Sequence, residues 1–132
     1  MRLFHRKKNR LCAETEIGAL FARGSGNFVH PIKAIYLISK DKEASYKVLV
    51  SVSKRNFKKA VDRNLIKRRI KEATRKNIPQ ISKLLKAKGL GINIAFVCVS
   101  KSIPTSQEIE ETVIRQILFL TNRIDKIEQD EN

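Results

Sequence analysis

The sequence predicts an α+β fold, a two-layer sandwich in which three main helices cover one face of a four-stranded mixed sheet, in the order αβββαβα. Runs of β-branched and aromatic residues alternate with segments whose apolar residues recur at helical spacing. Glycine or proline stands at several of the changes from one kind of segment to the other, at Gly24, within residues 86–91 and at Pro104. A length of 132 residues suits one domain, so we assign residues 1–132 to a single unit with one hydrophobic core.

The chain begins with a predicted helix over residues 13–23. Ile17, Leu20 and Phe21 recur at the spacing that places apolar side chains on one helical face. Gly24 follows as a C-terminal stop, because glycine commonly ends helices. We therefore expect the first helix to pack through one narrow face.

Four strands are expected in the middle of the chain. Residues 28–39 predict a short strand and then a longer one, because Pro31 interrupts the β-branched run. A charged turn at residues 41–43 leads into a third strand over residues 46–53. The nearly continuous apolar character of this third strand predicts a buried position in the sheet. Residues 92–99 form the fourth strand.

Three helical segments follow the third strand. Residues 59–77 predict a long charged helix, and residues 81–86 a short helical stretch. The last helix is expected over residues 106–126, after Pro104. We expect residues 124–132 to form a flexible acidic tail.

Charge is the most informative property of the composition. The chain carries 28 Lys and Arg against 13 Asp and Glu, a formal net charge of +15 with a pI near 10.2. A basic arm is expected over residues 1–12 and an acidic segment from residue 107 onward. Residues 54–76 alone contain eleven Lys and Arg against two acids. Such a charge favours a polyanionic partner, with nucleic acid first and an anionic membrane surface second.

The helix over residues 59–77 separates into two faces. Ile66, Ile70 and Ala73 point toward the core at 100° per residue. An opposite arc of about 140° contains Arg63, Asn64, Lys67, Arg68, Lys71 and Arg75. Like charges on one face weaken an isolated helix, and a merely solvated face usually mixes both signs. A membrane-bound helix would need a wide apolar stripe with bulky aromatics. Phosphate binding therefore explains this face best.

The sequence around this helix resembles a known signature. Residues 51–55 read Ser-Val-Ser-Lys-Arg, and residues 59–73 contain Arg-Asn followed by Lys-Arg. Together with a first helix that ends at residues 20–24 and a strand containing Tyr36, they resemble the protein component of bacterial ribonuclease P over residues 5–123. Two departures are that Leu65 replaces the usual third arginine and that the loop before the helix lacks a glycine and is about one residue longer.

The resemblance implies a non-catalytic subunit of an endoribonuclease that removes the 5′ leader from precursor tRNA in the cytoplasm. The expected partners are the catalytic RNA subunit, which holds Mg²⁺ and performs the hydrolysis, and the precursor tRNA. It also implies a left-handed crossover between the third and fourth strands. The residues expected to bind RNA are Lys54, Arg55, Lys59, Arg63, Asn64, Lys67, Arg68 and Lys71.

The resemblance further implies a leader-binding cleft between the sheet and its helices. Phe21 and Tyr36 match its aromatic positions, although the sequence alone allows either ring to be a core residue. Val50 and Val52 are expected on opposite faces of their strand, so that one of them lines the cleft. Aromatic rings in such a cleft would stack on unpaired bases with little sequence preference.

No catalytic or metal-binding residues are expected in the protein itself. Its acids are scattered, and neither His5 nor His30 has a second ligand at chelating distance along the sequence. Cys12 and Cys98 are read as two reduced thiols. The sequence indicates no membrane partner and no obligate protein partner. The alternatives are a structural RNA-binding protein of ribosomal type and, more distantly, a self-sufficient metal-dependent nuclease.

Overall fold

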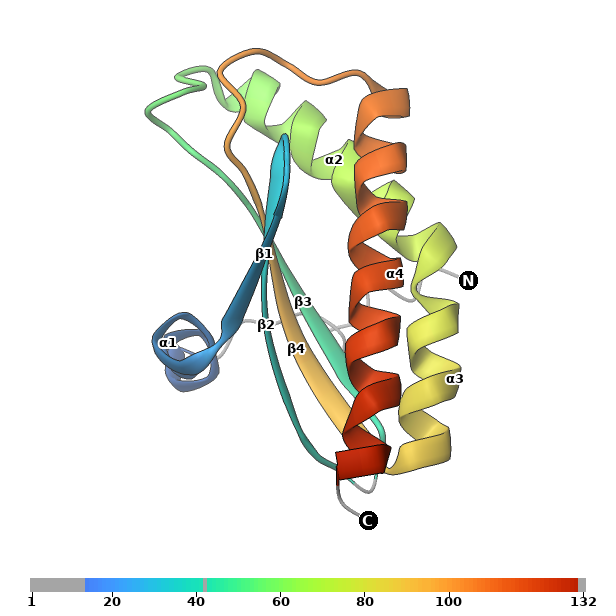
Figure 1. Cartoon of the computed structure of the whole chain (residues 1–132). Helices are drawn as coiled ribbons and strands as arrows, with labels where there is room; N and C mark the ends of the chain where they lie inside the picture. Colours follow the sequence, from blue (N-terminus) through green and yellow to red (C-terminus); the bar gives the residue numbers. More distant parts are fainter. Residues whose placement is uncertain (1–13, 42, 131–132) are drawn as a thin grey trace.

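One mixed sheet organises the protein, and helices lie on both of its faces (Figure 1). The structure is a computed structural model that describes residues 14–41 and 43–130. The elements in chain order are α1 (Glu14–Arg23), β1 (Ser25–Val29), β2 (Ile32–Lys40), β3 (Tyr46–Val52), α2 (Ala60–Asn77), α3 (Pro79–Lys88), β4 (Leu90–Cys98) and α4 (Ser106–Asp130). The α+β prediction is confirmed, with the short helical stretch developed into the full helix α3.

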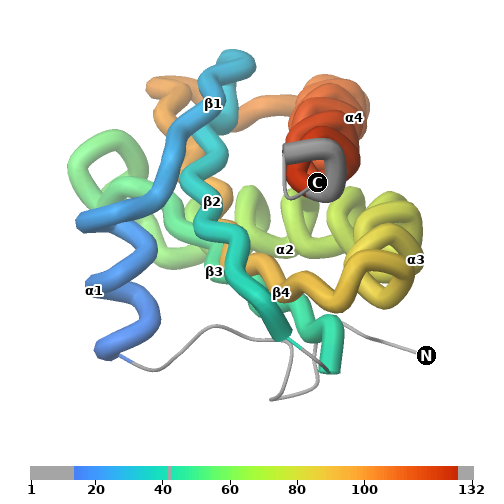
Figure 2. Tube along the Cα trace, turned by 60° about the horizontal axis from the view of Figure 1, so that its bottom comes forward, coloured from blue at the N-terminus to red at the C-terminus, as the bar shows by residue number. Residues whose placement is uncertain are grey.

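The strand order in the sheet is β1-β2-β4-β3. β1 and β2 form an antiparallel hairpin, β2 and β4 are antiparallel, and β3 and β4 are parallel. β3 is therefore an edge strand, and its residues alternate between buried and half-buried. The prediction of a buried position in the sheet was wrong, because apolar residues on both faces of β3 are covered by helices rather than by a second neighbouring strand. Figure 2 shows β3 beside β4.

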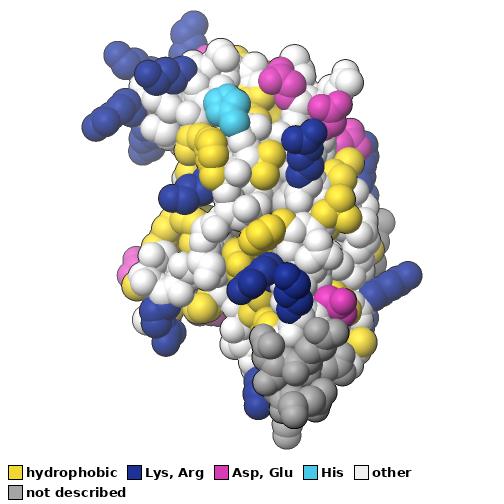
Figure 3. All heavy atoms as spheres, in the orientation of Figure 1, with side chains coloured by type: hydrophobic (Ala, Val, Ile, Leu, Met, Phe, Trp, Pro, Cys, Tyr) yellow, Lys and Arg dark blue, Asp and Glu magenta, His cyan; other side chains and the backbone are white. Residues whose placement is uncertain are grey.

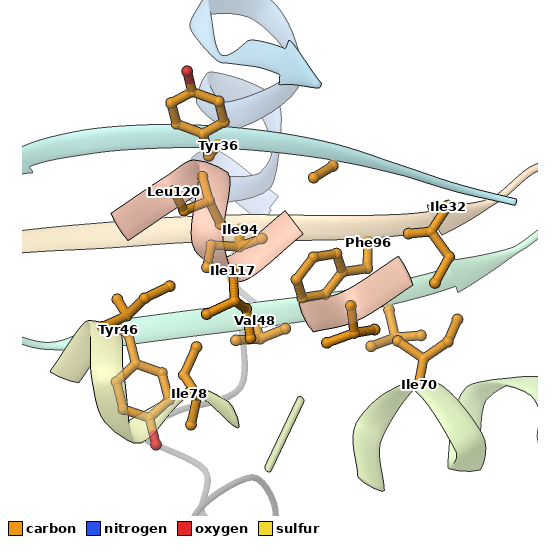
Figure 4. Close-up of a cluster of buried hydrophobic side chains, with 14 of the residues drawn as sticks. Ile32, Tyr36, Tyr46, Val48, Ile70, Ile78, Ile94, Phe96, Ile117 and Leu120 are labelled. Carbon is orange, nitrogen blue, oxygen red and sulfur yellow. The ribbon is translucent and has the colours of Figure 1, made fainter. Parts of the chain in front are cut away.

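The main core lies between the sheet and helices α2, α3 and α4. The helices contribute Ile66 and Ile70 from α2 and Ile117 from α4, all essentially inaccessible to solvent. From the sheet, Ile94 and Phe96 of the central strand β4 point into the same cluster (Figure 4). Because these side chains fill one side of the sheet, α2 is held with one face inward and the other outward.

α1 packs on the opposite face of the sheet. Its Leu20 is fully buried against Ala95 of β4. Glu16 forms an ion pair with Lys47 of β3, with 3.0 Å between a carboxylate oxygen and Nζ. The helices therefore do not all share one face of the sheet, and Figure 1 shows α1 alone on this side.

The ends of α3 and α4 are among the boundaries that differ from the sequence prediction. α4 continues to Asp130, and Ile124 is fully buried, so residues 124–130 continue the helix where a flexible tail was predicted. Gly89 ends α3 in the left-handed conformation with φ of 65°, and its N–H donates to the Leu85 carbonyl. The expected basic arm, residues 1–12, lies outside the described residues.

Candidate RNA interface

The loop from β3 to α2 carries the first part of the predicted RNA interface. Lys54 and Arg55 are exposed there. The Ser53 hydroxyl accepts hydrogen bonds from the backbone N–H groups of Arg55 and Asn56, at 3.1 and 3.4 Å. Phe57 is 5% exposed and anchors the loop in the core. The loop is therefore fixed by its own short-range contacts while its cations face solvent.

Arg63 has a structural role in addition to its charge. Its Nη1 donates to the carbonyl oxygens of Phe57 and Lys58, at 2.7 and 3.0 Å. These two bonds tie the end of the loop to the first turn of α2. Arg63 is half-buried, so part of its guanidinium remains available to an anion. The sequence predicted Arg63 as an RNA contact but gave no sign of these loop contacts.

The outward face of α2 carries the remaining predicted residues. Asn64 and Arg68 are exposed, whereas Lys67 and Lys71 are half-buried along the flank of the helix. Lys59 is the N-cap residue and makes no side-chain capping bond, so the cations begin where the helix dipole already favours anions. Figure 3 shows Lys and Arg side chains gathered over the β3–α2 loop at the upper left. The structure thus places all eight predicted residues on one continuous segment.

Two cations of α2 have partners that set them apart from this surface. Arg75 pairs with Glu72, and this carboxylate raises the pKa of the guanidinium above its usual value. Arg69 donates to the Pro104 carbonyl at 2.7 Å and so joins α2 to the segment before α4. Lys58, in contrast, is exposed in the loop and belongs to the basic surface. The sequence prediction omitted Lys58, although the dense run of charge around it was a sufficient signal.

The predicted cleft residues fall on different faces of the sheet. Phe21 of α1 is 49% exposed, which leaves it available to a ligand. Tyr36 is 6% exposed, and its ring packs edge-on against Phe119 of α4 with centroids 5.9 Å apart. Val50 and Val52 both face the same main core, because residues two apart on a strand share a face. The placement of Tyr36 in an open cleft and of the two valines on opposite faces must therefore be corrected.

Three further properties of the described residues concern metal binding, thiol reactivity and membrane insertion. Within residues 14–41 and 43–130, no three His, Cys, Asp or Glu side chains gather as a metal site. Cys98 is buried, and burial raises the pKa of its thiol. Across the same described ranges, no helix has both the length and the apolar character needed to cross a membrane.

Comparisons with known proteins agree with this geometry. A model of the Ribonuclease P family matches residues 5–118 of the chain. The chain belongs to the ribonuclease P protein family. The ribonuclease P protein component of Porphyromonas gingivalis is 30% identical over 119 residues, which cover 89% of this chain and 87% of that protein. The resemblance inferred from the signature residues is confirmed.

Solved ribonuclease P proteins share the fold at low sequence identity. The protein from Thermotoga maritima superposes with a TM-score of 0.64 at 18% identity, covering 82% of this chain and 94% of the other. A Staphylococcus aureus RNase P protein mutant with defective mRNA degradation activity gives a TM-score of 0.62 at 21% identity, covering 88% and 90%. Both comparisons support the α+β sandwich described above.

Proposed function

We propose that this protein binds the catalytic RNA of ribonuclease P and the single-stranded 5′ leader of precursor tRNA. The RNA subunit holds Mg²⁺ and performs the hydrolysis, and the particle works in the cytoplasm. The observation that carries this proposal is the fixed β3–α2 loop and outward α2 face, whose exposed side chains include Lys54, Arg55, Lys59 and Arg68. Guanidinium and ammonium groups on rigid elements suit an RNA backbone.

Membership of the family supports the same two roles, RNA binding by the protein and hydrolysis by the RNA subunit. The family fixes the context as a subunit of an endoribonuclease particle. The basic surface lies on α2, and its hydrophobic face is committed to the core through Ile66 and Ile70. An RNA bound there would contact the protein without disturbing its packing. Leu65 stands where the family usually has an arginine, so this helix has one cation fewer. The Leu65 side chain is half-buried.

The test is cleavage of a 5′-labelled precursor tRNA at near-physiological Mg²⁺. Three reactions are compared: protein alone, the ribonuclease P RNA of the same organism alone, and both together. Stimulation only by the combination, with a product that ends at the mature 5′ position, is expected. Cleavage by the protein alone would place an active site in this chain. No stimulation of the RNA would contradict the proposal and favour a structural RNA-binding protein of ribosomal type.

A further inference from the structure

α1 covers only part of its face of the sheet. The pairing register sets four residues side by side across all four strands: Phe28 with Lys33, Lys33 with Val97, and Val97 with Ser51. We call these four residues the open row. Paired side chains in a sheet share a face, and side chains two residues apart on a strand do so too. Lys33, Val97 and Ser51 therefore lie on the α1 side.

The neighbouring row shows where the cover ends. Ile35, Ala95 and Leu49, each two residues from a member of the open row, pack with Leu20 beneath α1. The open row itself stays accessible. Phe28 is 58% exposed, Lys33 is exposed, and Val97 and Ser51 are half-buried. Figure 3 shows the outline of the molecule stepping inward between the basic cluster and α1, with apolar and basic side chains along the recess.

The open row combines two kinds of contact that unpaired RNA needs. Phe28 offers a large aromatic surface to solvent, and its ring stands edge-on to His30 with centroids 6.1 Å apart. Lys33 is its direct cross-strand partner, and the end of the Lys33 side chain lies near Gly26, two residues before Phe28 on β1, so the ring and a cation share this stretch of the sheet. Bases of single-stranded RNA stack on exposed rings, and adjacent cations neutralise the phosphates. A duplex keeps its base faces covered and offers no comparable surface.

The row also leads into the RNA interface. Its last member, Ser51, stands three residues before Lys54 and lies close to the end of β3. A strand of RNA that crosses the sheet along the open row therefore reaches the basic loop. α1, with its exposed Phe21, borders the same face. The sheet thus provides a path from an aromatic edge to the cationic helix.

We propose that Phe28 is the stacking residue for the single-stranded leader, with Lys33 neutralising an adjacent phosphate. The site rests on the proposed function above, and it takes over the role that the sequence had given to Tyr36. On the α1 side of the sheet β2 carries Ile35 and Leu37 and no aromatic ring. The edge strand β1 supplies a ring there through Phe28. Both Phe28 and Lys33 are exposed, so their removal leaves the core intact.

The first experiment measures equilibrium binding of the reconstituted holoenzyme to precursor tRNA and to mature tRNA without a leader. Phe28→Ala is expected to weaken binding of precursor tRNA by about five-fold or more, the loss of one stacked base, and to leave mature tRNA unchanged. Phe28→Trp should retain the affinity, whereas Phe28→Leu should not. Leu118→Ala, at an apolar position of α4 that is 51% exposed, is the matched control and should change neither.

The second experiment reports the contact directly. The chain has no tryptophan, so Phe28→Trp places a single tryptophan in the open row, and its emission can be excited selectively at wavelengths where tyrosine does not absorb. Its emission should be quenched by precursor tRNA in the holoenzyme and not by mature tRNA, whereas Leu118→Trp should respond to neither. Equal effects of Phe28→Ala on both tRNAs, or an unquenched tryptophan, would overturn the leader site. Failure of the proposed function is distinguishable, because the wild-type protein would then fail to stimulate cleavage.

Discussion

Arg63 and Arg68 belong to the same basic surface of α2 but have different roles. Arg68 is exposed and makes no hydrogen bond or ion pair with the residues that the structure describes, whereas Arg63 holds the β3–α2 loop through two carbonyl oxygens. Arg68→Ala should lower the salt dependence of RNA binding by about one phosphate contact and leave the melting temperature unchanged. Arg63→Ala should lower both. A slope unchanged in Arg68→Ala would exclude a direct phosphate contact at that position.

Cys98 is expected to be chemically silent in the folded protein. Burial raises the pKa of its thiol, so at pH 8 less thiolate is present than in an exposed cysteine, and the thiolate is the reactive form. In a Cys12→Ser variant Cys98 is the only thiol. Iodoacetamide at pH 8 should label this variant slowly in buffer and rapidly in denaturant, as followed by mass spectrometry. Equal rates would show that the end of β4 opens readily.

Gly89 and Gly18 should have opposite effects on the free energy of unfolding when each is replaced by alanine. Gly89 ends α3 with φ of 65°, and a Cβ there would meet no atom within 4 Å. Gly89→Ala should therefore lower the free energy of unfolding by about 1 kcal/mol through backbone strain alone. Gly18 lies inside α1 with open space around it, so Gly18→Ala should raise the free energy by about 0.5–1 kcal/mol. Urea denaturation of both variants checks the signs, and a shared sign would contradict the argument.

At the scale of elements, local sequence patterns were sufficient to predict where helices and strands form. They were not sufficient to predict which elements pack against each other. The spacing of Ile66 and Ile70 predicted the inward face of α2, because helical periodicity is a local property. The edge position of β3 depends on pairing with β4, far along the chain, as in the pairing of Tyr46 with Ile92. Alternation in β2 shows that Tyr36 and Leu37 face opposite sides, but only the packing of α4 against Tyr36 decides which side the main core closes. For that reason the sequence left Tyr36 as a cleft residue, whereas its ring is buried against Phe119 of α4.

At the scale of the whole molecule, the fold separates charge from core. Core residues come from the sheet and from the inward faces of α2, α3 and α4. The outward face of α2 carries cations at several successive turns. Composition alone predicted only that the partner is a polyanion. The more specific functional prediction came from the family resemblance. Ile124 and Ile127 of α4 belong to this packing, although the acidic composition of the region predicted a tail from residue 124. The acidic composition of a segment predicts only its average solvent exposure, whereas the burial of the single residue Ile124 holds this part of α4 against the core.

A net charge of +15 should make the stability of the protein depend on anions. Like charges on Lys67, Arg68 and Lys71 repel one another in the compact state, and this repulsion is screened by salt. Sulfate should raise the melting temperature more than chloride at equal ionic strength, because a divalent anion can bind between neighbouring cations and stabilise the folded state by mass action. The Lys67→Gln/Lys71→Gln double variant should melt higher than wild type in low salt and respond less to sulfate. Identical sulfate responses in the two proteins, measured by circular dichroism, would show that anions act elsewhere than on α2.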